Sequence, residues 1–575
     1  MQKLLFFLLL PILWAYDTTN VVLTPESFGA VANDETQDNT LAFARLIEAA
    51  QTEMRAGRSV EIVLGNGTYH FYPTEAKKYE LFISNHDHEP LRPVALFIDK
   101  AENLTIKGNN TLLAMHGRMI PVVVQKSKNV KLQGFRIDYP RPALSQIEVV
   151  GIKDNRVEVR VLPETQYEIK ENRFVLKGEG YEQSLFVAMP FRADRHMKWN
   201  RADVSFNPKQ IEVNEQGNLY LYHWGEQPYV EVGDRYVLRS YYRPTPGILL
   251  SDAVDTQIQD VTVHYAEGMA LVAQNCTNVT LHHFSVAVPE KSERYFTTQA
   301  DATHFSGCRG KIISTQGLYE HMADDAINVH GTYLRVDSII DNQTVIAAFA
   351  HEQSFGYTWY EEGDALRLID RNTLLPLTGG MGATVEKLNT HQLQLKFASV
   401  DALAGLKDCQ MAVENLTAHP SVEFEKNIVR NNRARGALFS TPKPVICAYN
   451  VFDHTHGSAI LLCGDANGWY ESGPCEDVHI HHNTFINALT AKYQFTKGVI
   501  SIYPVLKEVS DKAYYHGRVV VEDNVFHTFD SPLYFALSVR EFLFRKNQVQ
   551  TNTDFVPIFP HTESKVEHVG TLVAD

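Results

Sequence analysis

The chain has 575 residues, of which 44% are hydrophobic and 21% charged. It therefore has enough apolar material for a large core, which excludes intrinsic disorder. Lys and Arg total 53 against 68 Asp and Glu, a formal net charge of −15, and this charge repels a phosphate backbone or an anionic membrane surface. We therefore expect neither a nucleic-acid nor a membrane partner, and neutral ligands fit better than polyuronates.

The N-terminus has the features of a secretory signal. Lys3 precedes an apolar run over residues 4–13, and the small residue Ala15 follows. The run is shorter than the roughly 20 residues of a spanning helix and has the length of a signal core. The sequence predicts a signal peptide over residues 1–15 and a periplasmic or secreted protein.

Six cysteines are too few for a disulfide scaffold. Cys463 and Cys475 flank a segment that contains glycine and proline, so two interpretations stay open for them. They close a loop as a disulfide, or they are buried thiols.

The first part of the mature chain, residues 16–140, predicts a capped start to a larger fold. Asp38 precedes a helical pattern in which Leu41, Leu46 and Ile47 face inward, and a strand pattern follows at residues 60–64. A short amphipathic helix of this kind covers the open end of a solenoid, whose first coil would otherwise expose its apolar interior.

A recurring strand-like phrase, led by Asn or Asp, organises the chain. Its first residues are Asn103, Asn129, Asp255, Asn278, Asn427, Asn450, Asn483, Asn524 and Asn547. Neighbouring copies recur after 23 or 26 residues at four places, which is the length of one coil of a β-solenoid. We predict an all-β fold, a right-handed parallel β-helix with an N-terminal cap helix.

Two stretches, residues 141–245 and 333–420, interrupt the period and resemble each other. The first contains Trp224 followed by a Gly-Asp pair at Gly233, and the second contains Trp359 followed by a Gly-Asp pair at Gly363. We predict two small β-barrel domains inserted at solenoid corners, where insertions disturb the core little. They leave β-helix coils at residues 246–332 and 421–575.

Three aspartates lie between the two insertions. Asp301 precedes Asp324 by 23 residues, one repeat period, so we expect the two to stack in adjacent coils with Asp325 beside them. Glycoside hydrolysis needs one protonated and one ionised carboxyl, and crowded carboxylates supply this pair because their repulsion raises one pKa. The alternatives are a calcium site, a structural aspartate ladder, or solvated corners.

An Asp followed one coil later by Asp-Asp is similar to the acidic trio of β-helical polygalacturonases, but their Gly-His-Gly and Arg-x-Lys signatures for uronate are absent at matching positions. With the cap, the two insertions and the segments 319–331 and 464–475, the chain resembles glycoside hydrolase family 110, the bacterial α-1,3-galactosidases, over nearly its whole mature length. That resemblance implies exo-removal, with inversion and without a metal cofactor, of terminal α-1,3-linked galactose. Its expected glycan partners carry the blood-group B determinant or linear α-galactosyl epitopes.

By the same resemblance Asp301 is the general acid, and Asp324 and Asp325 place the water as base. An exo-acting enzyme needs a pocket with an aromatic face and polar hydrogen-bonding groups. The candidate substrate-binding residues are Trp469, Glu471, Arg435, His304 and His330. No set of histidines has a convincing metal-ligand spacing, so no metal ligand is assigned.

Two rival functions stay open. A β-helical polysaccharide lyase would use the aspartates to bind calcium and a Lys or Arg as base, and a non-catalytic glycan-binding solenoid would keep them as structural groups. The preference between branched and linear acceptors and the oligomeric state, including a homo-oligomer, are left undecided by the sequence.

Overall fold

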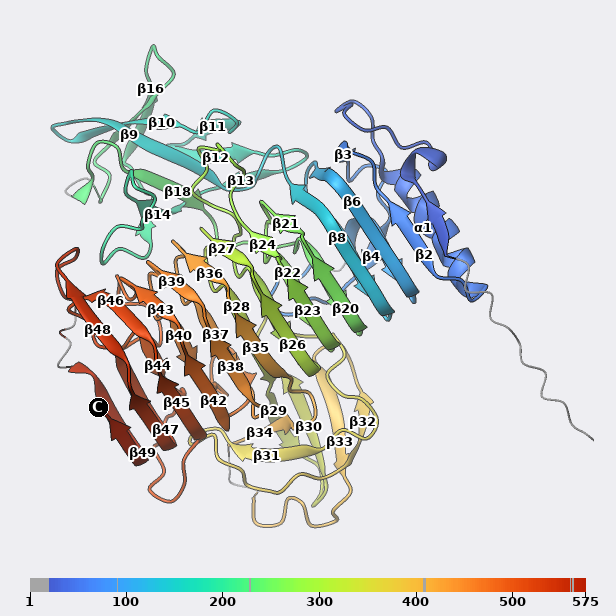
Figure 1. The fold of residues 1–575 in the computed structure, drawn as a ribbon, viewed down its shortest axis with the longest axis vertical. Helices are drawn as coiled ribbons and strands as arrows, with labels where there is room; N and C mark the ends of the chain where they lie inside the picture. The colour runs from blue at the N-terminus through green and yellow to red at the C-terminus, as the bar shows by residue number, and fades with distance from the viewer. Residues whose placement is uncertain (1–19, 90, 227–228, 407–409, 559, 561–562) are drawn as a thin grey trace, which may run out of the picture.

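The computed structural model describes residues 20–89, 91–226, 229–406, 410–558, 560 and 563–575. The predicted signal peptide, residues 1–15, lies outside the described residues. The chain forms a parallel β-helix in which three parallel sheets run along the solenoid axis (Figure 1). No helix among the described residues has the length and apolar character that crossing a membrane requires.

The first sheet begins under the N-terminal cap and reaches the last coil. Its strands are β1 (Val21–Leu23), β2 (Val60–Val63), β6 (Glu102–Met115), β8 (Lys128–Asp138), β20 (Val254–Gln259), β23 (Thr277–His282), β26 (Arg309–Thr315), β35 (Ser421–Glu425), β38 (Val445–Ala448), β42 (Asp477–His481), β45 (His516–Glu522), β47 (Tyr534–Arg545) and β49 (Lys565–Ala574). The second sheet shares β6 and β8. Its other strands are β3 (Gly67–Phe71), β21 (Thr262–Val263), β24 (Ser285–Val286), β27 (Leu318–Glu320), β36 (Ile428–Arg430), β39 (Val451–Asp453), β43 (Thr484–Ile486), β46 (Val525–Phe529) and β48 (Gln548–Asn552).

The third sheet, which we call the site sheet, ends on β47 and β49. Its other strands are β5 (Leu91–Asp99), β7 (Ile120–Gln125), β19 (Ile248–Ser251), β22 (Leu271–Gln274), β25 (Thr303–Ser306), β28 (Ile327–Thr332), β37 (Ala437–Ser440), β40 (Ile460–Leu462) and β44 (Ile500–Ile502). Short antiparallel strands lie against this sheet: β4 (Lys78–Glu80) pairs with β5, and β41 (Glu471–Ser472) pairs with β28.

The N-terminal end is covered by helix α1 (Thr40–Arg55), which follows the 3₁₀ turn η1 (Pro25–Phe28). Leu46 and Ile47 are buried as predicted, whereas Leu41 is 48% exposed and its predicted inward position is wrong. Asp38 accepts a hydrogen bond from Thr40 N at 2.9 Å and so satisfies a donor of the first helical turn.

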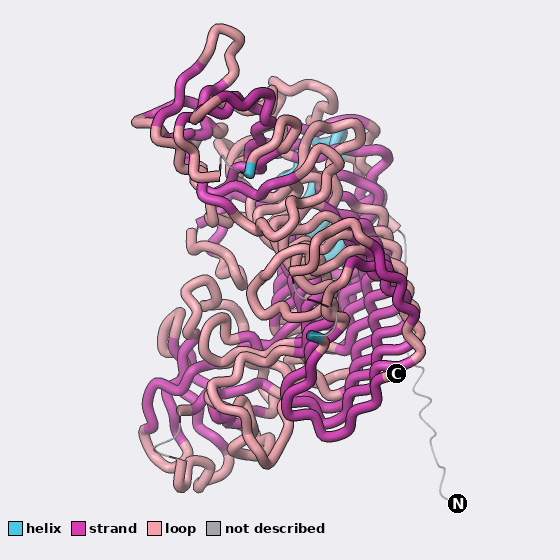
Figure 2. The backbone as a smooth tube through the Cα atoms, turned by 90° about the vertical axis from the view of Figure 1, so that its left-hand side faces the viewer, coloured by secondary structure: helices cyan, strands magenta, loops and turns pink. Residues whose placement is uncertain are grey.

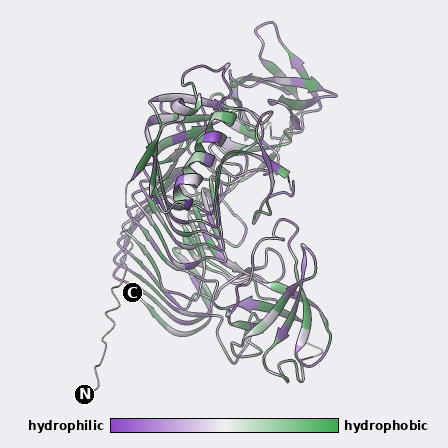
Figure 3. Ribbon diagram, turned by 90° about the vertical axis from the view of Figure 1, so that its right-hand side faces the viewer, coloured by the Kyte–Doolittle hydropathy of each residue, from purple (hydrophilic) through white to green (hydrophobic). Residues whose placement is uncertain are grey.

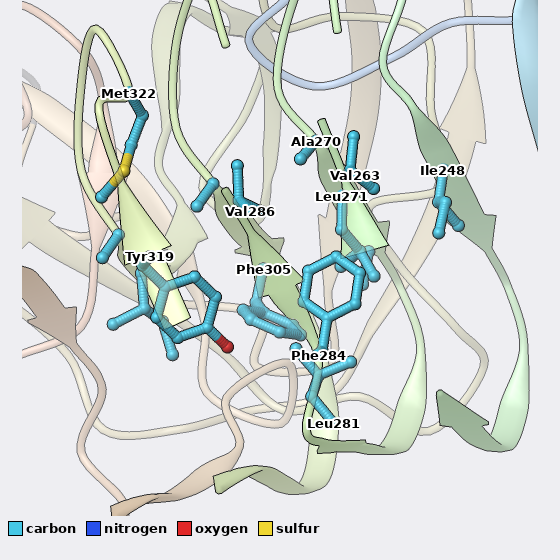
Figure 4. Close-up of a cluster of buried hydrophobic side chains, with 14 of the residues drawn as sticks. Ile248, Val263, Ala270, Leu271, Leu281, Phe284, Val286, Phe305, Tyr319 and Met322 are labelled. Atoms are coloured by element: carbon cyan, nitrogen blue, oxygen red, sulfur yellow. The ribbon is translucent and has the colours of Figure 1, made fainter. Parts of the chain in front are cut away.

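The interior of the solenoid is apolar, with aromatic rings inside the coils. Phe284, Phe305 and Tyr319 lie in it fully buried, and Figure 4 shows them beside Leu271 and Val286. Figure 3 shows apolar and polar residues mixed along the strands, as expected where one face is inside and the other outside.

The asparagines of the repeat phrase stack along the solenoid. Asn427 N donates to Asn450 Oδ1 and Asn450 N to Asn483 Oδ1, both at 2.9 Å. Asn483 N donates to Asn524 Oδ1 at 2.9 Å, and Asn524 N to Asn547 Oδ1 at 3.1 Å. Each of these amides therefore satisfies a backbone N–H of the preceding coil, which explains the asparagine in the later copies of the phrase. The earlier copies lie inside strands of the first sheet, where Asn129 Nδ2 donates to Asn103 Oδ1 and Asn278 Nδ2 to Asp255 Oδ1.

The first insertion is an antiparallel domain with its own core around Trp224. Its strands are β9 (Ser145–Lys153), β10 (Arg156–Val161), β11 (Tyr167–Lys170), β12 (Arg173–Lys177), β13 (Glu182–Ser184), β14 (Val187–Phe191), β15 (Val204–Ser205), β16 (Gln210–Val213), β17 (Leu219–Tyr222) and β18 (Arg235–Arg239). They form a seven-stranded and a three-stranded sheet.

The second insertion has its own core around Trp359. It is a six-stranded antiparallel sheet of β29 (Leu334–Ile339), β30 (Thr344–Phe349), β31 (Leu366–Asp370), β32 (Ala383–Lys387), β33 (Gln392–Phe397) and β34 (Met411–Asn415). Both insertions leave the ladder intact, because β7 still pairs with β19 and β28 with β37. Both lie on one side of the solenoid (Figure 2).

The cysteines show which of the two sequence interpretations applies. All five that the structure describes are free and buried, and Cys463 and Cys475 are among them. The two are buried thiols in this structure, so the loop between them is not closed by a disulfide.

Candidate active site

A pocket opens where three strands of the site sheet begin. Its walls come from several coils and loops, and its lining residues are Asn85, Arg243, Met269, Asp301, His304, Asp324, Asp325, Asn328, Arg435, Leu438, Cys463, Asp465, Trp469, Glu471, Gln494 and Phe495. Seven of the eight predicted site residues are in this lining. The eighth, His330, lies behind it and contacts His304.

The register of the site sheet places Asp301, Asp325 and Arg435 in one column. Thr303 pairs with Ile327, and Ile327 pairs with Ala437. Asp301, Asp325 and Arg435 each precede one of these three paired residues by two positions. The expectation that Asp324 stacks on Asp301 is therefore off by one residue. The reason is that the coil from Thr303 to Ile327 spans 24 residues, one more than the period of 23.

The three carboxylates converge, with one oxygen of each within 4.8 Å of the others. The side chains of Asp301 and Asp325 are 5% and 1% exposed, and that of Asp324 is 23% exposed. Asp325 is held by Arg435 twice: its Oδ1 accepts from the backbone N at 3.0 Å and its Oδ2 from the guanidinium at 2.8 Å. Asp324 Oδ1 is buried and has no hydrogen-bond partner within the protein, although the Arg435 guanidinium lies 3.7 Å from it.

The surroundings move the pKa values of Asp301 and Asp324 in opposite directions. Burial raises the pKa of Asp301 well above its usual range, and the Asp324 carboxylate adds to the increase. Burial also acts upward on Asp324, but Arg435 and further arginines outweigh it and hold the pKa of Asp324 below its usual value. Those further arginines are Arg433, Arg243 and Arg239. The site thus combines an acid that keeps its proton with a carboxylate that stays ionised.

Two buried histidines fix the proton of Asp301. His330 Nδ1 lies 2.6 Å from the carbonyl oxygen of Gly331, so this nitrogen carries the hydrogen and donates it. His330 Nε2 then accepts from His304 Nε2 at 2.9 Å, which leaves His304 Nδ1 as an acceptor 2.8 Å from Asp301 Oδ2. Burial lowers the pKa of His304 to about 4, so both rings are neutral near pH 7 and Asp301 must supply the hydrogen of that last bond.

Strand β41 places Glu471 beside the hydrogen-bonded pair His304 and His330. Glu471 Oε1 lies 3.6 Å from His330 Nε2 and accepts from Asn85 Nδ2 at 3.4 Å. Trp469 forms another wall of the pocket, where its ring stacks on His351 from the second insertion at 4.3 Å. Asp465 fixes the loop because its carboxylate accepts from the backbone N of Trp469 at 2.7 Å.

Sequence reasoning missed several residues of the pocket. Asn85 comes from a loop before β5, and Arg243 from the segment that leaves the first insertion. Asn328 occupies the ladder position next to His304, and its buried Oδ1 has no partner in the protein. No repeat position or motif marks Asn85 or Arg243, whereas Asn328 stands in the conspicuous segment 319–331.

The described residues hold two groups of side chains that could bind a metal ion. One is the aspartate trio and the other is His196, Asp453 and His454. In the trio, the Arg435 guanidinium lies 2.8 Å from Asp325 and 3.7 Å from Asp324. This cationic side chain already neutralises the carboxylates where a calcium ion would have to bind.

Known proteins resemble the chain in both sequence and domain content. Residues 145–235 match the family model described as GLAA-B beta-barrel domain I. An alpha-1,3-galactosidase B of Parabacteroides distasonis is 39% identical over 94% of this chain and 89% of its own length, and one of Bacteroides fragilis is 40% identical over 92% and 91%. An alpha-1,3-galactosidase A of Bacteroides fragilis is 30% identical over 88% and 85%.

The fold, the acidic pocket and these relatives define a glycoside hydrolase built on a parallel β-helix. The chain belongs to the α-1,3-galactosidase family, glycoside hydrolase family 110.

Proposed function

We propose that the chain is an exo-acting, inverting α-1,3-galactosidase that removes terminal galactose from blood-group B type or linear α-galactosyl glycans. The observation that carries the glycosidase proposal is the convergence of three carboxylates within 4.8 Å in the wall of a pocket. Inversion is inferred from the family, because this spacing is shorter than the roughly 6.5–9.5 Å of most inverting pairs. The signal peptide predicted from the sequence supports an activity outside the cytoplasm.

The chemistry divides between Asp301 and Asp324. Asp301 gives its proton to the glycosidic oxygen, and so gives up its hydrogen bond to His304 Nδ1, as the bond from that oxygen to the galactose C1 breaks. Asp324 takes a proton from a water molecule as the water oxygen forms its bond to C1. Asp325 has both oxygens bonded to Arg435, so it orients Arg435 and Asp301 rather than the water.

The charge of the pocket supports a neutral sugar as substrate. Besides Asp301, which keeps its proton, four carboxyl groups line it, from Asp324, Asp325, Asp465 and Glu471, against the guanidinium groups of Arg243 and Arg435. A uronate would bring a further negative charge into this group at a Coulombic cost. Glu471 and Asn328 present oxygens that accept hydrogen bonds from galactose hydroxyls, and Trp469 presents a ring to its apolar face.

Proton NMR of the released galactose tests the proposal. The purified protein is incubated with Galα1-3Gal and with a branched, fucosylated B-type trisaccharide, in EDTA, beside an Asp324→Asn control. We expect wild type alone to release β-galactose first. Early α-galactose would contradict inversion, and it is the outcome of direct attack by a carboxylate, for which a separation of about 5 Å is typical. No release from either glycan would contradict the exo-acting assignment for these substrates.

A further inference from the structure

Two exposed aromatic side chains lie at one end of a strand pair in the first insertion. Phe186 directly precedes β14 and is 50% exposed, and Tyr241 follows β18 and is 51% exposed. Their ring centroids are 6.0 Å apart at an interplanar angle of 70°. The backbone holds them together, since Phe186 N donates to Arg239 O at 3.2 Å. We call Phe186 and Tyr241 the aromatic pair.

Tyr241 is fixed next to the charged groups that surround the catalytic carboxylates. Its hydroxyl donates to Asp203 Oδ2 at 3.4 Å, and its ring lies 5.2 Å from the Arg239 guanidinium. Asp203 pairs with Arg433, and Arg433 and Arg239 are two of the arginines that lower the pKa of Asp324. Tyr241 is therefore in contact with charged groups that act on the electrostatics of Asp324.

The same segment continues into the pocket. Arg243, two residues after Tyr241, lines the pocket and lies 5.7 Å from the Trp469 ring. Phe186, the other member of the aromatic pair, borders a groove of the first insertion. Aromatic and polar side chains line this groove, among them Phe206, Asn172 and Asn207. The aromatic pair therefore borders an outer groove through Phe186 and lies two residues along the chain from a pocket residue through Tyr241.

We propose that the aromatic pair is a subsite for the neutral sugar units that carry the terminal galactose. This inference rests on the proposed exo-acting function, because the pocket then holds one galactose and the remaining glycan must leave through its mouth. Exposed rings with fixed positions stack on the apolar faces of pyranoses at little entropic cost. The anchored Tyr241 hydroxyl fixes that ring while leaving half of the side chain open to solvent.

The test compares a substrate that reaches the aromatic pair with one that does not. We measure kcat/KM for a B-type tetrasaccharide and for p-nitrophenyl α-galactoside, and use their ratio. Phe186→Ala and Tyr241→Ala should each lower this ratio by about three- to tenfold, the range of a lost aromatic contact. Tyr241→Phe keeps the ring but loses the hydroxyl bond to Asp203 that fixes it, so it should lower the ratio less than Tyr241→Ala does. Tyr449→Ala is the matched control, since Tyr449 is 50% exposed and stacks on His482 outside the pocket.

The outcomes separate this inference from the proposed function. If wild type cleaves both substrates and neither alanine variant changes the ratio, the subsite is wrong while the exo-galactosidase remains. If wild type cleaves neither, the proposed function fails and the subsite falls with it. Calorimetry with the inactive Asp324→Asn protein gives a direct reading: adding Phe186→Ala should weaken tetrasaccharide binding about three- to tenfold and galactose binding less than about twofold. Equal weakening of both ligands would overturn the inference.

Discussion

Asp301 and Asp325 occupy the same register position of two neighbouring coils, and the backbone connects them. Asp325 N donates to Asp301 Oδ1 at 3.3 Å, and Ala302 N donates to Asp325 O at 2.8 Å. Ladder stacking thus brings two buried carboxylates together without any special loop. Arg435 continues the column in the next coil and supplies the positive charge that this stack needs.

Asp324→Asn and Asp325→Asn should both inactivate the enzyme but differ in stability. Asp324 Oδ1 has no direct hydrogen bond and only a 3.7 Å contact with Arg435, so the amide should cost activity by about three orders of magnitude and destabilise the fold less than Asp325→Asn does. Asp325→Asn removes the carboxyl group that the buried Arg435 contacts at 2.8 Å and leaves it only the Asp324 contact at 3.7 Å, so it should also destabilise the fold by about 3 kcal/mol. Kinetics and urea unfolding of both variants check this. Equal stability of the two proteins would contradict the assigned contacts.

The pH profile of kcat/KM should report Asp324 on its acidic limb. Asp324 must be ionised, and its lowered pKa places that limb below pH ~4, the value of an unperturbed aspartate. Arg243→Gln removes one of the charges that lower this pKa, so the acidic limb should move to higher pH. Arg540→Gln, a substitution of a side chain that is 61% exposed on the outer surface, should leave the limb in place. An unmoved limb in Arg243→Gln would show that another group sets it.

Buried neutral histidines should make the fold less stable in mild acid. Burial lowers the pKa of His456 to about 4, against about 6.5 in an unfolded chain. Neutral His456 therefore contributes its full share to the free energy of unfolding above pH ~6.5. This contribution is lost as the pH falls toward 4, because in this range only the unfolded state takes up the proton. Between pH 7 and 5 this one residue should remove about 2 kcal/mol.

Urea unfolding of His456→Gln at both pH values measures that contribution. The variant loses the ring contacts to Thr490 Oγ1 and Arg201 O, so it should be less stable at pH 7 but should lose less on acidification. A pH dependence identical to that of wild type would show that His456 is not the titrating group.

The repeat predicted the solenoid because every coil contains an apolar strand that packs on its neighbours. In the later coils an asparagine also accepts a hydrogen bond from a buried backbone N–H. The aspartate cluster could be predicted for the same reason, since ladder stacking turns a sequence period into proximity. The exact partner of Asp301 could not, because coil length varies: Leu271 pairs with Thr303 after 32 residues and Ile460 with Ile500 after 40.

Trp469 and Glu471 were predicted and line the pocket, but other pocket residues were not, because they come from irregular parts of the chain. Asn85, Arg243 and His351 come from segments distant in sequence. The roles of His304 and His330 also changed, from candidate substrate ligands to the buried pair that orients Asp301. Their spacing predicted their nearness to the trio but not which ring nitrogen each bond would use.

The asparagine ladder gives a prediction about stability that is independent of catalysis. Asn483→Ala should destabilise the fold by about 2–4 kcal/mol, because Asn450 N and Cys447 O both lose a buried partner. Asn547 ends the ladder and is partly exposed, so water can replace its amide and Asn547→Ala should cost about 1 kcal/mol or less. Urea unfolding of the two variants, with p-nitrophenyl α-galactoside kinetics on the folded proteins, measures the difference. Equal losses would mean that the ladder contributes by packing alone, since the hydrogen-bond argument requires the interior position to cost more than the end.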